Sequence, residues 1–116
     1  MNMKIRRIAD LLGATVLCGE CQLDEEALSA CGSDMMSDVL AYVKDQAVLL
    51  TGLVNPQVIR TAMMMDMRCV VFVRSKRPTA EMIQLAEENH IVILASNYRL
   101  YEACGQLYAH GLGSEA

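Results

Sequence analysis

The sequence predicts a single α/β domain in which helices pack on a largely parallel sheet of four or five strands. Three apolar segments, Ala47–Leu50, Cys69–Val73 and Ile91–Leu94, begin at residues 47, 69 and 91, a constant interval of 22 residues. Each is followed by a polar turn and then by a stretch with helical spacing. Consecutive strand–helix units pair their strands in parallel, because each helix returns the chain to the same edge of the sheet.

Residues 1–30 are expected to form a helix and two short strands before these units. The predicted amphipathic helix within residues 1–12 has three apolar residues on one face: Ile5, Ile8 and Leu12. Gly13 follows as a helix stop. Strands are predicted at 14–17 and 27–31, and the acidic segment 19–26 between them is expected to be a solvated loop.

Residues 31–112 are expected to form the core strand–helix units, beginning with a helix after the second short strand. Ser33 or Asp34 can cap this helix. Its inner face is predicted from four residues: Met36, Val39, Leu40 and Val43. Chain length and the continuous pattern indicate one domain over residues 1–116.

Polar caps and prolines mark the helices of the three regular units. Asn55 is a favourable N-cap and Pro56 a favourable first helical residue. Pro78 follows Pro56 by 22 residues and is expected to have the same role. Ser96 or Asn97 is expected to precede the last helix. The apolar positions of that helix are Leu100, Cys104, Leu107 and Tyr108.

Composition excludes several classes of function. Hydrophobic residues make up 53% of the 116-residue chain, which is enough for one core, and the net charge is −4. Binding nucleic acid requires clustered cations, so nucleic acid is not an expected partner. No apolar run reaches the roughly 18 residues of a membrane span. We therefore expect no membrane association and a cytoplasmic location, which five scattered cysteines also favour.

The clearest candidate site lies where the three parallel strands end. Their turns meet at one edge of the sheet, together with helix N-termini that offer free N–H groups. The candidate ligand-binding residues are Thr51, Gly52, Asn55, Arg74, Ser75, Lys76, Ser96 and Asn97. Arg77 and Arg99 add cations, and Gly52 would allow a ligand to approach the backbone closely. We call these turns the rim, and they predict a site for an anionic small molecule. The alternative is that they are ordinary solvated turns.

Cysteines and methionines suggest two weaker hypotheses. Cys18 and Cys21 form a CxxC pair, which can bind a metal or act as a redox pair, but no matching second pair of ligands follows it. We expect Cys18 to be a core residue and no metal or cofactor to be bound. Met63, Met64, Met65 and Met67 point in different directions on a helix and cannot all face one core, so some of this surface is expected to be exposed or covered by another chain.

Known catalytic signatures are missing from the sequence. There is no G-x-x-x-x-G-K-[ST] phosphate loop, no G-x-G-x-x-G and no G-x-S-x-G elbow. No catalytic residue is assigned, and the chain is predicted not to be an enzyme.

From Cys31 onward the chain resembles the DRTGG domain, a small module. The matching stretches are CGSDMMSDVLAYV, VLLTGLVNPQVIRTA, VVFVRSKRPTAEMIQLAEENHIVIL and SNYRLYEACGQLY. Within the pentapeptide that names the family, only Thr51 and Gly52 are matched. The family is similar in fold to the N-terminal domain of HPr kinase and, more distantly, to that of Mur ligases. Because those relatives keep their catalytic machinery in other domains, the resemblance implies an α/β regulatory module.

Two functions follow as hypotheses. DRTGG domains also occur attached to phosphotransacetylase-like enzymes and CBS domains, which implies ligand sensing. The first hypothesis is therefore a non-enzymatic regulatory or ligand-binding module, expected to be a homodimer, that senses an anionic metabolite or nucleotide. Stand-alone members that resemble this chain are bacterial or archaeal and sometimes accompany iron-hydrogenase genes. The alternative is an interaction or assembly subunit for a redox enzyme such as a hydrogenase.

Overall fold

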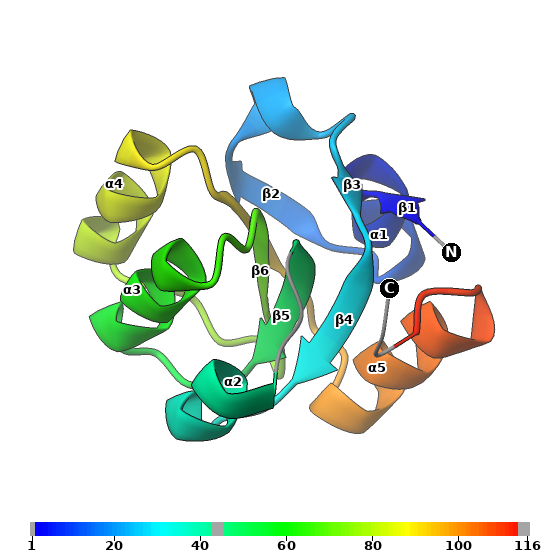
Figure 1. Cartoon of the computed structure of the whole chain (residues 1–116). Coiled ribbons are helices and arrows are strands. Elements are labelled where there is room, and N and C mark those ends of the chain that lie inside the picture. The colour runs from blue at the N-terminus through cyan, green and yellow to red at the C-terminus, as the bar shows by residue number, and fades with distance from the viewer. Residues whose placement is uncertain (1, 43–45, 114–116) are drawn as a thin grey trace.

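The computed structural model describes residues 2–42 and 46–113 and has a five-stranded sheet at its centre (Figure 1). The strands in spatial order are β2 (Thr15–Cys18), β7 (Val92–Ala95), β6 (Cys69–Phe72), β5 (Ala47–Thr51) and β4 (Ser29–Gly32). Strands β4 to β7 pair in parallel, and β2 joins the edge in the antiparallel direction. The predicted largely parallel sheet is therefore confirmed.

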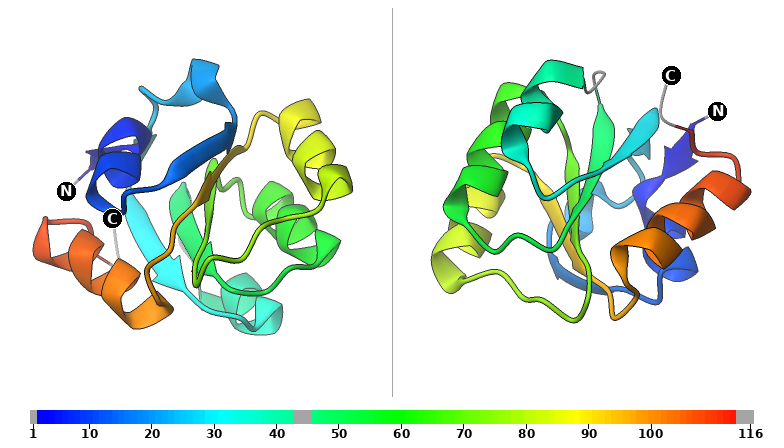
Figure 2. Two further views of the ribbon diagram at one scale, coloured as in Figure 1. Left: turned by 180° about the vertical axis from the view of Figure 1, so that it is seen from behind. Right: turned by 90° about the horizontal axis from the view of Figure 1, so that it is seen from below.

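Helices cover both faces of this sheet and give a three-layer arrangement. One face is covered by α2 (Met36–Tyr42), α3 (Pro56–Met64) and α4 (Ala80–Glu88). The other face is covered by α1 (Ile5–Leu11) and α5 (Leu100–Ala109). Figure 2 shows the sheet between these two groups of helices when the molecule is seen from below. No helix in residues 2–42 and 46–113 is long and apolar enough to cross a membrane.

The strands are buried on both faces, which explains their continuous apolar sequences. Alternate side chains go to opposite cores, because successive residues of a strand point to opposite sides. The core beneath α2, α3 and α4 receives Leu49, Val70, Phe72 and Ile93. The core beneath α1 and α5 receives Val48, Leu50, Val71 and Leu94.

The N-terminal third differs from the prediction in its details. The first helix begins at Ile5, because Met3–Lys4 (β1) pairs with Glu26–Ala27 (β3) in a separate two-stranded sheet. The predicted strand at 27–31 is accordingly divided between β3 and β4. The segment expected to be a loop contains a 3-10 turn at Glu20–Gln22. Its carbonyls accept hydrogen bonds from N–H groups at the start of α1, a long-range contact that local patterns do not reveal.

The start of α3 was predicted correctly, and that of α4 wrongly. Asn55 caps α3 by accepting from the Gln57 N–H at 2.8 Å, and Pro56 follows as the first helical residue. Pro78 does not repeat this role, because Thr79 caps α4 through its hydroxyl. The N-cap position of α5 is Arg99, without a side-chain cap.

Two predicted inner-face residues lie on the surface. Leu40 of α2 is 41% exposed and Tyr108 of α5 is 73% exposed, so the buried faces are narrower than the sequence spacing indicated. Val43 lies outside the described residues. In the methionine run, Met63 and Met64 are exposed, as predicted, whereas Met67 is in the core.

Replacing Thr61 by Val is expected to stabilise the fold. Thr61 is fully buried on α3, and its hydroxyl has no hydrogen-bond partner within the described residues. Val has nearly the same shape and removes a desolvated polar group, which should raise the free energy of unfolding by about 1 kcal/mol. Chemical denaturation measures this. In contrast, Thr79→Val removes a helix cap and should lower stability by about 1 kcal/mol. A loss of stability in Thr61→Val would show that the Thr61 hydroxyl contributes to the fold.

Candidate functional site

The three predicted turns lie side by side at the carboxyl edge of the parallel strands. The parallel hydrogen-bond ladder of the sheet continues beyond the ends of the strands. The Val73 N–H donates to Thr51 O at 3.0 Å, and the Ser96 N–H donates to Phe72 O at 2.9 Å. These bonds connect the ends of β5, β6 and β7. The expected placement of the rim residues is therefore confirmed, while their binding of a ligand stays a prediction.

Asp34, which follows β4, joins this edge and holds the turn after β5. Its Oδ1 accepts hydrogen bonds from the Thr51 hydroxyl at 2.9 Å and from the Gly52 N–H at 2.8 Å. Thr51 in turn accepts from the Leu53 N–H at 3.1 Å. The sequence suggested Asp34 as a helix cap, and its role in the turn is a finding of the structure. The Ser33 hydroxyl, the other predicted cap, accepts a hydrogen bond from the Met35 N–H at 3.0 Å, just before α2 begins.

The turn after β6 has left-handed backbone angles and is hydrogen-bonded to the turn after β7. Arg74 and Ser75 both have φ of 59°, a left-handed conformation that costs non-glycine residues about 1 kcal/mol or more each. The Arg74 N–H donates to Tyr98 O at 2.7 Å and the Ser75 N–H to Ser96 O at 3.1 Å. The Ser75 hydroxyl also donates to Asn97 Oδ1 at 2.9 Å. Hydrogen bonds to the neighbouring turn thus hold a conformation that local preferences disfavour.

The Arg74 side chain packs directly against Gly52. A Cβ atom at position 52 would meet the Arg74 guanidinium, so a larger residue there would displace the end of this flexible side chain, while the close approach of a ligand stays a prediction. The Gly52 N–H is already bound to Asp34. Arg74 Nη2 lies 3.8 Å from Asp34 Oδ2, at the limit of an ion pair, and the Arg74 side chain remains 48% exposed. Both partners are half exposed, so solvent weakens this ion pair.

Burial divides the eight predicted residues into two groups. The buried group is Thr51, Gly52 and Ser96. Ser96 donates its hydroxyl to Leu12 O at 2.8 Å and accepts from the Tyr98 N–H, so it organises the turn and does not face a ligand. The exposed group is Asn55, Arg74, Ser75, Lys76 and Asn97. The neighbouring cations Arg77 and Arg99 are also exposed, so the accessible part of the rim combines cations with hydroxyl and amide groups.

The CxxC cysteines have different environments. Cys18 is buried at the end of β2 and donates to Ile91 O at 3.4 Å, whereas Cys21 is exposed. Burial raises the pKa of the Cys18 thiol, which disfavours the nucleophilic thiolate. Cys18 is therefore a core residue, as expected. Burial also raises the pKa of Cys31 and Cys104.

Comparison with known proteins agrees with this fold. The profile of the DRTGG domain matches residues 7–109, which is most of the chain. The chain belongs to the DRTGG domain family. No curated protein sequence matches this DRTGG domain. The similarity to the HPr kinase N-terminal domain stays a prediction.

The DRTGG domain is similar in structure to part of a pyrophosphatase from Clostridium perfringens. That structure contains the CBS and DRTGG domains of the enzyme's regulatory region in complex with its activator, diadenosine tetraphosphate. The TM-score is 0.75 at 15% sequence identity, with coverage of 97% of this chain and 48% of that chain. The DRTGG domain thus spans about half the length of its neighbour, and at this identity the likeness shows the fold alone.

Asp34→Ala is expected to loosen the rim. The substitution leaves the buried Thr51 hydroxyl and the Gly52 N–H without their shared acceptor, which should lower the free energy of unfolding by about 1–3 kcal/mol. Chemical denaturation measures this loss. Asp38→Ala removes an exposed carboxylate from α2 and serves as the control. Equal stability of the two variants would contradict the role of Asp34.

Proposed function

We propose that this DRTGG domain is a non-enzymatic regulatory module that binds an anionic small molecule, such as a nucleotide, at the rim. The ligand would contact the exposed part of the rim: Arg74, Ser75, Lys76 and Asn97. The observation that supports this best is the Arg74–Ser75 turn, where two strained residues present a half-exposed guanidinium beside a hydroxyl. Strained backbone of this kind is concentrated at binding sites.

Asp34 leaves much of Arg74 available for such a ligand. A guanidinium has five N–H donors in a planar fork, and Asp34 approaches one nitrogen only at 3.8 Å. A phosphate could bind the remaining donors in the bidentate manner that Arg favours. Lys76, Arg77 and Arg99 are exposed near the same edge and would add attraction for an anion in a chain of net charge −4.

The pyrophosphatase structure supports nucleotides as the first ligands to test. Its regulatory region contains a DRTGG domain and was crystallised with an adenine nucleotide activator. A regulatory role needs no catalytic group in the DRTGG domain itself, because the bound ligand only has to favour one state of the protein.

Diadenosine tetraphosphate or ATP is expected to raise the melting temperature of the wild-type domain. A ligand present at about 100 times its Kd adds about 2.7 kcal/mol to the stability of the folded state, which corresponds to roughly 10 °C for a domain of this size. Differential scanning fluorimetry with AMP, ATP, diadenosine tetraphosphate and acetyl phosphate measures the shift. The rise should disappear in Arg74→Ala with Lys76→Ala.

Two further variants separate a specific site from general charge effects. Arg7→Ala with Arg60→Ala also removes two exposed cations, but from α1 and α3, and should retain the shift. Gly52→Ala keeps every charge and displaces the Arg74 guanidinium, so it should weaken binding. If none of the four compounds changes the melting temperature, or if both double variants lose the shift equally, the proposal fails.

Exposed apolar side chains on α2 and α3 support a second candidate, a surface for a protein partner. Met64 is 69% exposed, and Met63 and Leu40 are each 41% exposed. We propose a second copy of this chain as the partner, because methionine surfaces adapt well to self-association. The pyrophosphatase match gives no support to a redox enzyme as the partner.

A dimer through these methionines should dissociate when charge is introduced. Met63→Lys with Met64→Lys places two ammonium groups in the contact, which should shift the mass measured by size-exclusion chromatography with light scattering from dimer to monomer. Tyr101→Lys, on the opposite face of the sheet, is the control because Tyr101 is 90% exposed. A wild-type domain that stays monomeric at high concentration would refute this second candidate.

A further inference from the structure

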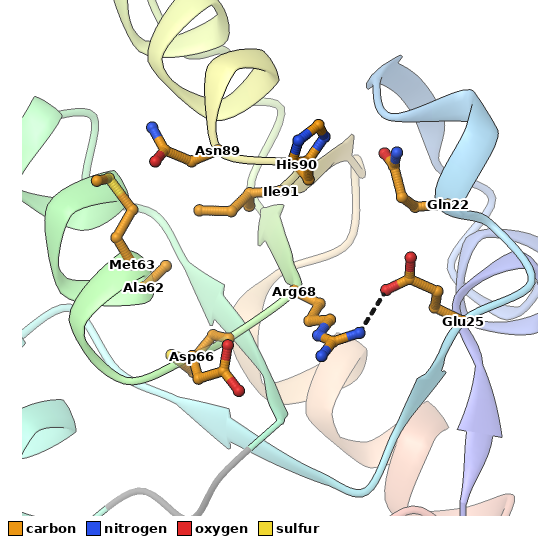
Figure 3. A pocket seen from close by; sticks show the side chains of 10 residues that line it. Gln22, Glu25, Ala62, Met63, Asp66, Arg68, Asn89, His90 and Ile91 are labelled. Carbon is orange, nitrogen blue, oxygen red and sulfur yellow. Dashed lines mark hydrogen bonds and ion pairs between the residues drawn. The ribbon is translucent and has the colours of Figure 1, made fainter.

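A cavity of about 520 Å³ lies at the amino edge of the sheet, opposite the rim. Figure 3 shows the side chains around it, which come from the 3-10 turn Glu20–Gln22 and the segment after it, from the ends of α3 and α4, and from the residues just before β6 and β7. Its apolar lining comes from buried residues: Ala62, Met67 and Ile91. The volume is within the range of small-molecule pockets, about 300–1,000 Å³.

Two strained residues line this cavity. Helices α1, α3, α4 and α5 all end with the same hydrogen-bond pattern, in which one residue adopts a left-handed backbone. That residue is glycine after α1 (Gly13) and α5 (Gly111), as local sterics favour. It is Asp66 after α3 and His90 after α4, with φ of 53° and 57°. At the two helix ends that line the cavity, a residue other than glycine holds the left-handed position. Each of these residues lowers the stability of the fold by about 1 kcal/mol.

The charges around the cavity favour a cation. Glu25 pairs with Arg68 at 2.9 Å, and the hydrogen bond from this carboxylate raises the pKa of Arg68, which stays positively charged. The Asp66 carboxylate also faces the Arg68 charge, so the two carboxylates and one guanidinium of the lining leave one negative charge in excess. An adjoining hollow of about 190 Å³, which shares His90 and Ile91 with the cavity, adds two exposed carboxylates: Glu20 and Glu87. The C-terminal ends of α3 and α4 contribute partial negative charge at the same place.

We propose that this cavity binds a small aliphatic organic cation of the diamine class. One ammonium group binds the Asp66 carboxylate, and the methylene chain lies on the apolar lining. The second ammonium group extends into the adjoining hollow, toward Glu20 and Glu87. This cavity lies at the opposite edge of the sheet from the rim. Binding of a diamine here can therefore be tested independently of anion binding at the rim.

Titration of the ¹⁵N-labelled domain with 1,5-diaminopentane tests the proposal by two-dimensional NMR. Saturable shifts are expected at the backbone amides of Met67, Arg68 and Ile91, with a Kd of about 1 mM or lower. 1-Pentanol has the same chain length without charge and should give no saturable shift. If the diamine causes no saturable shift at these amides, or if 1-pentanol shifts them with equal affinity, the proposal is overturned.

Matched carboxylate variants identify the contact. Asp66→Asn removes the charge while keeping a residue that tolerates a left-handed backbone, and it should raise the Kd at least about tenfold. Asp38→Asn, on α2, removes the same charge elsewhere and should leave the Kd unchanged. Equal weakening in both variants would mean that only the overall charge attracts the diamine, which overturns the site.

Asp66→Gly separates binding from stability. Glycine removes the strain of the left-handed position, so the melting temperature should stay the same or rise by a few degrees while diamine binding is lost. A lower melting temperature together with unchanged binding would show that Asp66 serves the fold alone.

Discussion

The parallel ladder through β5, β6 and β7 is the constraint on which both edges of this molecule depend. Its register aligns Leu50 with Val71 and Val71 with Leu94, so corresponding points of successive strand–helix units lie next to one another. Every turn that follows one of these three strands therefore reaches one edge, and the helices α3 and α4 end near the other. Burial on both faces holds this alignment, because a slip by one residue would move each side chain into the opposite core.

This polarity explains why the two edges have different chemistry. Helices α3 and α4 begin at the carboxyl edge, where N-termini and exposed cations give positive potential. They end at the amino edge, where carboxylates and C-termini give negative potential. The proposed anion site at the rim and the proposed cation site at the amino edge would therefore be complementary consequences of one architecture. A regulatory module with two such sites can couple two ligands through the same sheet.

Strained non-glycine residues are present at both edges. Arg74 and Ser75 are left-handed at the rim, and Asp66 and His90 are left-handed around the cavity. In each place long-range hydrogen bonds or helix-end bonds maintain the conformation. The strain is compatible with a stable fold because two extensive apolar cores support the same sheet.

The sequence by itself determined the strand–helix units, the parallel sheet, the Asn55 cap and the meeting of the three turns. These features depend on periodicity and on local backbone preferences, which can be read within a few residues. Only the tertiary structure decided that Asp34 holds the Thr51–Gly52 turn, that Arg74 fills the space at Gly52, and that β1 pairs with β3. Such contacts join residues distant in sequence, and the choice among possible partners is made by the packing of the whole chain. The amino-edge cavity was missed for the same reason, although two helix ends without glycine, at Asp66 and His90, were a signal that the sequence already contained.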